Sequence, residues 1–250
     1  MEQRDRTAVA TFFTPEPMAA GRPTMLGDGE VQHARVRRVG VGDRVRLVDG
    51  AGAVGWGQVV KLGKAQAMID VDVVDRVAPL PVIHLMVPIA DRDRMLLLAE
   101  KATELGVFSW RPVMWRRSRS VTPRGEGVSF QAKVRARMTA ALTQSGGAWL
   151  PVLYPDATPD RAVAACAAGA RWLLDPDGEP VAAPHLSAPL TVAVGPEGGL
   201  EAEERSQFIA AGFVPVKLAP LVLRFETAAM AALAVARSAL LTATVERARV

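Results

Sequence analysis

Cysteine and histidine are scarce in this sequence. Cys166 is the single cysteine among 250 residues, so the chain cannot form an internal disulfide, which suits a reducing, cytoplasmic compartment. The three histidines, His33, His84 and His185, are far apart in the chain and lack the spacing of metal ligands. We therefore expect no disulfide framework, no metal and a cytoplasmic protein.

Long apolar runs are also missing. Residues 1–6 are rich in charge and lack the apolar run of a signal peptide. The most apolar stretch, residues 228–241, is short and is interrupted by Arg237. It therefore predicts a buried amphipathic helix and no membrane span. The sequence shows no internal repeat and no low-complexity tail.

The composition is that of a protein with a sizeable core. Apolar residues make up 50% of the 250 positions, which is enough for one large domain or two of moderate size. The formal net charge of +4 is compatible with a polyanionic partner, although many basic proteins bind no nucleic acid.

The first third of the chain has the pattern of a small β domain. Short segments rich in valine or aromatic residues alternate with glycine and aspartate, at residues 8–13, 43–50, 55–62 and 65–74. Asp49 and Gly50 form a strong turn signal between two of them. Residues 1–78 are therefore predicted to form a small β-barrel or sandwich, followed by a linker that contains Pro79 and Pro81.

The remainder, residues 79–250, alternates apolar strands with helices. The strands are expected at 82–89, 108–115, 171–175, 190–195 and 213–218, and the helices at 93–106, 127–145, 159–168, 201–211 and 226–247. This alternation predicts an α/β domain with a mostly parallel sheet and helices on both faces.

A glycine-rich turn follows one of these strands. The segment LTVAVGPEGGL places Gly195, Gly198 and Gly199 after an apolar strand and before a helix. Ligands bind at this edge of open α/β sheets, and glycine lets the backbone approach them. The segment is neither a phosphate loop nor a Gly-x-Gly-x-x-Gly pattern. Taken alone, such a turn is more often structural than functional.

A second segment, KLAPLVLRFETAAMAALAVA, leads from a strand into a long helix. Arg224 and Glu226 lie close to the start of that helix, at the same sheet edge. Each residue also has a structural interpretation. Glu226 suits a first helical turn because it complements the helix dipole, and Arg224 suits a surface ion pair.

Together, VGPEGGL and KLAPLVLRFETAA resemble the C-terminal signature of the ribosomal RNA small subunit methyltransferase E family, of the SPOUT superfamily. DRMLLLAEKATELGV, TQSGGAWLPVL and HARVRRVGVGDRVRLVDG are similar to further family segments, so the resemblance covers nearly the whole chain. The departures are Arg37, Thr143, Gly147 and Ala219, at positions where the family commonly has leucine, glutamate, arginine and glycine respectively.

The resemblance implies a PUA-like barrel and a SPOUT domain with a trefoil knot. It also implies a homodimer that uses S-adenosylmethionine to methylate N3 of a uridine in 16S ribosomal RNA of the small subunit. Two alternatives are another SPOUT enzyme, such as a ribose 2′-O-methyltransferase, and an RNA-binding assembly factor without activity. The base-methylation signature disfavours the first, and the intact glycine loop disfavours the second.

On this resemblance, six residues are assigned to the cofactor, through backbone groups and apolar contact with adenine. They are Val194, Gly195, Gly199, Leu218, Leu223 and Thr227. Arg224 is expected to donate hydrogen bonds to uracil or phosphate. Glu226 is expected to accept the N3 proton or to orient Arg224, and we favour the second role because a carboxylate beside a guanidinium is a poor base.

RNA contacts are expected from two arginine clusters, since the guanidinium group binds phosphate with bidentate geometry. One cluster contains Arg35, Arg37 and Arg38, near His33. The other lies in a loop after a strand and contains Arg116, Arg117, Arg119 and Arg124. Either cluster is also compatible with an ordinary solvated basic surface.

Overall fold

The computed structural model describes residues 7–120, 124–181 and 186–247, so residues 1–6 and His185 lie outside the described part of the chain. The chain divides into two compact units. The first unit consists of residues 1–79 and 139–150, and the second of residues 80–138 and 151–250. The sequence suggested one division near residue 78 and gave no sign that residues 139–150 join the first unit.

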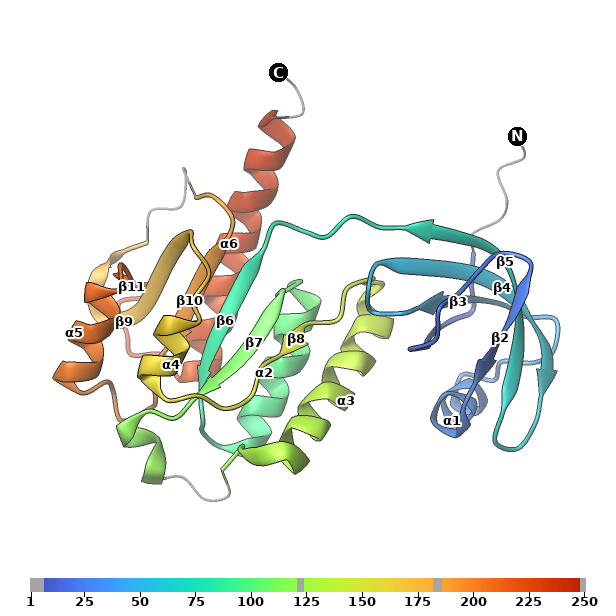
Figure 1. The fold of residues 1–250 in the computed structure, drawn as a ribbon, viewed down its shortest axis with the longest axis horizontal. Helices are drawn as coiled ribbons and strands as arrows, with labels where there is room; N and C mark the ends of the chain where they lie inside the picture. The colour runs from blue at the N-terminus through green and yellow to red at the C-terminus, as the bar shows by residue number, and fades with distance from the viewer. Residues whose placement is uncertain (1–6, 121–123, 182–185, 248–250) are drawn as a thin grey trace. The chain divides into compact units, whose positions relative to one another are not determined.

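The first unit is built on a five-stranded sheet in the order β1-β3-β4-β5-β2, in which β1 and β3 are parallel and the other pairs are antiparallel. The strands are β1 (Ala10–Phe13), β2 (Arg22–Leu26), β3 (Arg44–Val48), β4 (Ala53–Leu62) and β5 (Ala67–Arg76). A helix, α1 (Asp28–Val36), packs near β1 (Figure 1). The sequence pattern predicts β1, β3, β4 and β5 but gives no signal for β2 or α1.

Local patterning explains both the successes and the omissions in this unit. Leu47 and Ile69 are fully buried on strands with clear alternation. In contrast, α1 buries only Val31 and Ala34, so its amphipathic signal is weak. The expected turn at Gly50 is confirmed, because its φ of 73° is in the left-handed region that glycine tolerates.

Residues 139–150 join the first unit through apolar packing. Leu142 at the end of α3 and Ala148 beyond it belong to one buried cluster with Val48, Val54 and Trp56 of the small sheet. Burial of these side chains is the physical reason why the division of the chain is discontinuous.

The second unit contains a six-stranded, fully parallel sheet in the order β11-β9-β10-β6-β7-β8. The strands are β6 (Ile83–Pro88), β7 (Ser109–Val113), β8 (Val152–Leu153), β9 (Ala170–Pro180), β10 (Leu190–Val194) and β11 (Val214–Lys217). All five residues of β10 are buried, as expected for a strand covered on both faces. The predicted parallel α/β sheet is therefore confirmed.

Helices cover both faces of this sheet (Figure 1). They are α2 (Arg92–Glu104), the 3₁₀ helix η1 (Arg116–Ser120), α3 (Gly127–Ser145), α4 (Pro159–Ala164), α5 (Ala202–Ala210) and α6 (Phe225–Arg247). The α4 and α5 helices contact each other on one face, while α2 and α6 contact each other on the opposite face. The trefoil knot stays a prediction.

The α6 helix is the one described helix that is long and apolar enough to cross a membrane, over Phe225–Ala243. Its contacts are those of a core helix, since it packs against α2, β6 and β10. Arg237 is 7% exposed and donates to the carbonyl oxygens of Pro81, Leu105 and Gly106 at 2.7, 3.0 and 2.7 Å. The buried helix expected from the sequence is therefore observed.

Candidate functional site

A cavity of about 390 Å³ lies at the edge of the sheet where β10 and β11 end, beside residues 174–177 in the middle of β9. Because β10 and β11 flank β9 in the sheet, the loops that follow them converge although they are separated in sequence. The cavity is lined mainly by three segments, residues 174–177, 194–200 and 216–223 without Pro220, together with Arg205, Phe225 and Ala228. The two motif segments thus meet at one site, as the sequence predicted.

The glycine-rich loop, residues 195–199, forms one wall of this cavity. Its last glycine, Gly199, has a φ of 74°, and its amide donates to the Pro196 carbonyl at 2.9 Å. At the end of β10, the Val194 carbonyl accepts a hydrogen bond from the buried indole of Trp115 at 3.1 Å. The loop therefore starts from a fixed strand end and turns through a conformation that favours glycine.

The segment after β11 supplies an apolar wall. Leu218, Ala219 and Leu223 are half-buried and line the cavity, whereas Leu221 and Val222 line it with exposed fractions of 76% and 83%. The departure at Ala219 thus lies in the cavity wall itself. Such a surface suits the flat apolar face of an adenine base.

The structure adds a charged pair to this cavity that sequence reasoning missed. The Oδ2 atom of Asp175 accepts a hydrogen bond from Nε of Arg205 at 2.6 Å, and its Oδ1 accepts from the Asp177 amide at 2.9 Å. Both Asp175 and Arg205 line the cavity. Their signal was the strand RWLLD, because its carboxyl end lies at the same sheet edge as the glycine-rich loop.

The two proposed catalytic residues have different environments. Arg224 is exposed, whereas Glu226 is 7% exposed in the first turn of α6. Arg224 precedes the first residue of α6, and among the described residues no ion pair joins Glu226 to Arg224. The expected role of Glu226 in orienting Arg224 therefore has no supporting contact.

Glu226 instead has an ion pair with Arg94 on α2, where Nε and Oε1 are 3.9 Å apart. Arg94 also donates a hydrogen bond to Glu197 of the glycine-rich loop. The sequence predicted a helix at residues 93–106, which contains Arg94, but gave this residue no role. Thr227, one residue beyond Glu226, is exposed on α6. The cavity-lining residues include none of Arg224, Glu226 and Thr227.

The arginines proposed for RNA differ in how many protein partners they have. In the first unit, Arg35 donates to the carbonyl oxygens of Gly63 and Lys64 at 3.4 and 2.9 Å. Arg38 is exposed, with a φ of 57°. Arg38 is thus the more available of the two for an external phosphate.

In the second unit, the basic loop is largely paired with acids of the protein. Arg117 donates to the Gly198 carbonyl at 2.9 Å, and therefore braces the glycine-rich loop. Arg116 pairs with Glu201 and Glu203. Arg124 also has an acidic partner, Glu126, and the side chain of Arg119 lies outside the described part of the chain. RNA binding by Arg117 stays a prediction.

Among the described residues, no group of three or more His, Cys, Asp or Glu side chains could hold a metal ion. The charged and apolar groups of the cavity are instead suited to an organic ligand that carries both charge and a flat ring.

Family models match both parts of the chain. The RNA methyltransferase domain model matches residues 77–237, and the RNA methyltransferase PUA domain model matches residues 26–71. Ribosomal RNA small subunit methyltransferase E from Mycobacterium bovis is 30% identical over 219 residues, which is 83% of this chain and 82% of the relative. The Synechocystis protein of the same name is 30% identical over 212 residues, which is 80% of this chain and 67% of the relative.

Solved structures agree with these matches. The Neisseria gonorrhoeae methyltransferase E, bound to S-adenosyl methionine, is 27% identical with a TM-score of 0.80, over 92% of this chain and 97% of the other. A methyltransferase from Legionella pneumophila, also with bound cofactor, is 25% identical with a TM-score of 0.81, over 93% and 98%. With these similarities over both units and across the cavity, this chain belongs to the ribosomal RNA small subunit methyltransferase E family.

Proposed function

We propose that this protein binds S-adenosylmethionine in the cavity beside β9, at the ends of β10 and β11, and methylates N3 of a uridine in 16S ribosomal RNA of the small subunit. The observation that carries the proposal is the convergence of the glycine-rich loop and the segment after β11 on one cavity. Its volume of about 390 Å³ is within the usual range for small-molecule sites.

The residues present fit this cofactor. Val194, Leu218 and Leu223 offer apolar contact for adenine, while Gly195 and Gly199 leave backbone groups accessible. Asp175 and Arg205 offer charges of both signs for the polar parts of the molecule. When bound, S-adenosylmethionine supplies a methyl group on a sulfonium, so its departure needs no acid catalyst.

The protein has two tasks toward the uridine. N3 carries a proton at neutral pH that must be accepted, and negative charge that spreads onto the uracil carbonyls must be stabilised. Arg224 is exposed and able to donate hydrogen bonds to the uracil carbonyls or to a phosphate. Glu226 is our candidate proton acceptor, because its Oε1 pairs with Arg94 at 3.9 Å while its Oε2 has no hydrogen-bond partner in the described part of the chain and is able to accept a proton.

The decisive test is methylation of small ribosomal subunits from a strain that lacks this protein, followed by mass spectrometry of the digested RNA. We expect one new methyl group, on N3 of a uridine. A methyl group on a ribose would instead establish the 2′-O alternative. Absence of both methylation and calorimetric binding of S-adenosylmethionine would favour a non-enzymatic assembly factor.

The role of Arg224 is tested by R224A. Removing one donor from developing negative charge typically lowers kcat about 10²- to 10³-fold, so we expect a loss of that size with nearly unchanged cofactor affinity. R224K, which keeps the positive charge, should retain part of the activity. Wild-type methylation by R224A would contradict this role.

The proposed assembly is a homodimer in the cytoplasm. This assembly is the one that the family resemblance implies. Light scattering that returned the monomer mass at micromolar concentration would contradict the dimer.

A further inference from the structure

The backbone of Arg94 is fixed in the first turn of α2. The Asp91 carboxylate caps this helix and accepts hydrogen bonds from the amides of Asp93 and Arg94 at 3.1 and 3.0 Å. The next residue, Met95, is fully buried. The Cα atom of Arg94 is therefore fixed, and its guanidinium can reach only a limited region.

That guanidinium meets two acids from two other segments of the chain. It donates to Glu197 of the glycine-rich loop, and its Nε lies 3.9 Å from Oε1 of Glu226 on α6. Arginine is suited to such a bridge because its planar group carries five N–H donors, whereas lysine presents a single point charge. Arg94 on α2 thus connects the glycine-rich loop with the segment that leads into α6.

The two ion pairs of Arg94 differ in solvent exposure, and therefore in how much each contributes to the stability of the site. The side chains of Arg94 and Glu197 are 32% and 44% exposed, and an ion pair with that exposure contributes little by itself. The Glu226 side chain is only 9% exposed, and an ionised carboxylate in such a place requires a partner. Within the described residues, Arg94 is the cation that supplies an ion pair to Glu226.

We propose that Arg94 is a positioning residue of the methyl-transfer site, which holds the glycine-rich loop and the Glu226 carboxylate in one arrangement. The inference rests on the proposed function and deepens it, because it assigns to α2 the link between cofactor binding and the candidate proton acceptor. It predicts that loss of this one side chain weakens cofactor binding and also slows methyl transfer when the cofactor is saturating.

The first test compares R94Q with R92Q. Both variants remove one positive charge from the same helical turn, but the Arg92 guanidinium lies 5.6 Å from the centre of the Phe130 ring and is not paired with Glu226. We expect R94Q to weaken calorimetric binding of S-adenosylmethionine and to lower kcat on small subunits, each about 10- to 100-fold, as for other residues that orient a ligand-binding group. R92Q should change either quantity less than about twofold, and R94K should recover part of the R94Q loss.

A double-mutant cycle tests the connection to the loop. E197Q should weaken cofactor binding, and the double variant R94Q/E197Q should bind no more weakly than R94Q, since both changes remove the same bridge. Additive losses, or equal behaviour of R94Q and R92Q, would overturn the proposal.

Hydrogen exchange separates this inference from the proposed function. Amides of residues 195–199 should exchange faster in R94Q than in the wild type or in R92Q, with no ligand added. Unchanged exchange would reject the positioning role even for an active enzyme. Conversely, the exchange could be faster in R94Q while the wild-type protein binds no S-adenosylmethionine. That outcome would support the positioning role of Arg94 and reject the proposed function.

Discussion

Among single residues, Arg237 shows how one buried cation can fix a helix. Its guanidinium donates hydrogen bonds to three backbone carbonyl oxygens, that of Pro81 before β6 and those of Leu105 and Gly106 after α2. Desolvation by burial lowers the pKa of Arg237, which is tolerated because each of these carbonyls stabilises the charged group. The arginine in the apolar helix is therefore an anchor inside the second unit.

We predict that R237M lowers the free energy of unfolding by about 2–4 kcal/mol, because three partly buried carbonyls lose the donor that the buried guanidinium supplies. Urea unfolding measures this loss. R161M is the matched control, since Arg161 is exposed on α4, and it should change stability by less than about 0.5 kcal/mol. Equal losses in the two variants would show that the three hydrogen bonds contribute little.

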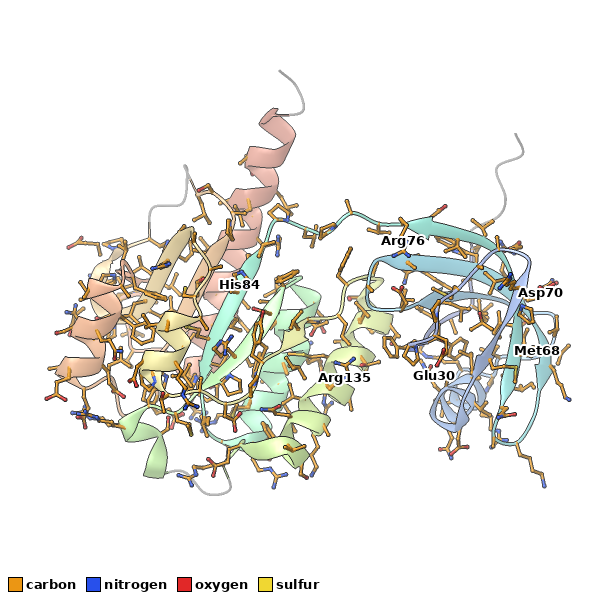
Figure 2. The ribbon with its side chains drawn as sticks, viewed as in Figure 1. Glu30, Met68, Asp70, Arg76, His84 and Arg135 are labelled. Carbon is orange, nitrogen blue, oxygen red and sulfur yellow. The ribbon has the colours of Figure 1, made fainter. Side chains whose placement is uncertain are left out.

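His84 gives a residue-scale prediction about pH. It lies on β6 (Figure 2), with its Nδ1 2.7 Å from the Ser109 hydroxyl oxygen. Burial, and then the positive charge of Arg111, lowers the pKa of His84 below its ordinary value of 6.5. The unfolded chain therefore binds this proton more readily, so the contribution of His84 to stability is complete above 6.5 and is lost as the pH falls toward the folded-state pKa.

H84Q should remove that dependence. The wild type is expected to lose stability more steeply than H84Q as the pH falls below 6.5, by at most about 1.4 kcal/mol per pH unit. Urea unfolding at several pH values gives both curves. Parallel curves would mean that His84 does not titrate differently in the two states.

Among the elements, the glycine-rich loop depends on backbone conformation as well as on side chains. Gly199 has a φ of 74°, and a Cβ at that position would meet only the Arg117 guanidinium, at 3.8 Å. The strain of G199A is therefore conformational, about 1–2 kcal/mol, and it acts on the cavity wall. We predict that G199A weakens S-adenosylmethionine binding, as measured by calorimetry.

Gly146 offers a matched control for this prediction. It has the same φ of 74°, a Cβ added there would have no atom within 4 Å, and it belongs to the first unit. G146A should therefore lose a similar amount of stability and leave cofactor affinity unchanged. If both variants bound the cofactor like the wild type, the conformation of Gly199 would not be important for the site.

For the molecule as a whole, binding of ribosomal RNA should depend on salt. Each lost phosphate contact reduces the slope of log affinity against log salt by about 0.7–0.9. We predict this reduction for R38Q in the full chain, because Arg38 is exposed. R22Q, which removes an exposed arginine from β2, should keep the wild-type slope. An unchanged slope for R38Q would exclude Arg38 from the RNA surface.

Local sequence was sufficient to locate most elements and the edge of the sheet where the site lies. Apolar runs identified five of the six parallel strands, all except the two-residue β8, and two motifs identified the edge where the central strands end. The pairing of distant side chains, in contrast, emerged from the folded chain alone. Arg94 and Glu197 are 103 positions apart, and Asp175 and Arg205 are 30 apart. Such pairs form only when α2, α5 and β9 pack against the rest of the unit. That packing brings together residues far apart in the chain, so the local sequence pattern does not predict it.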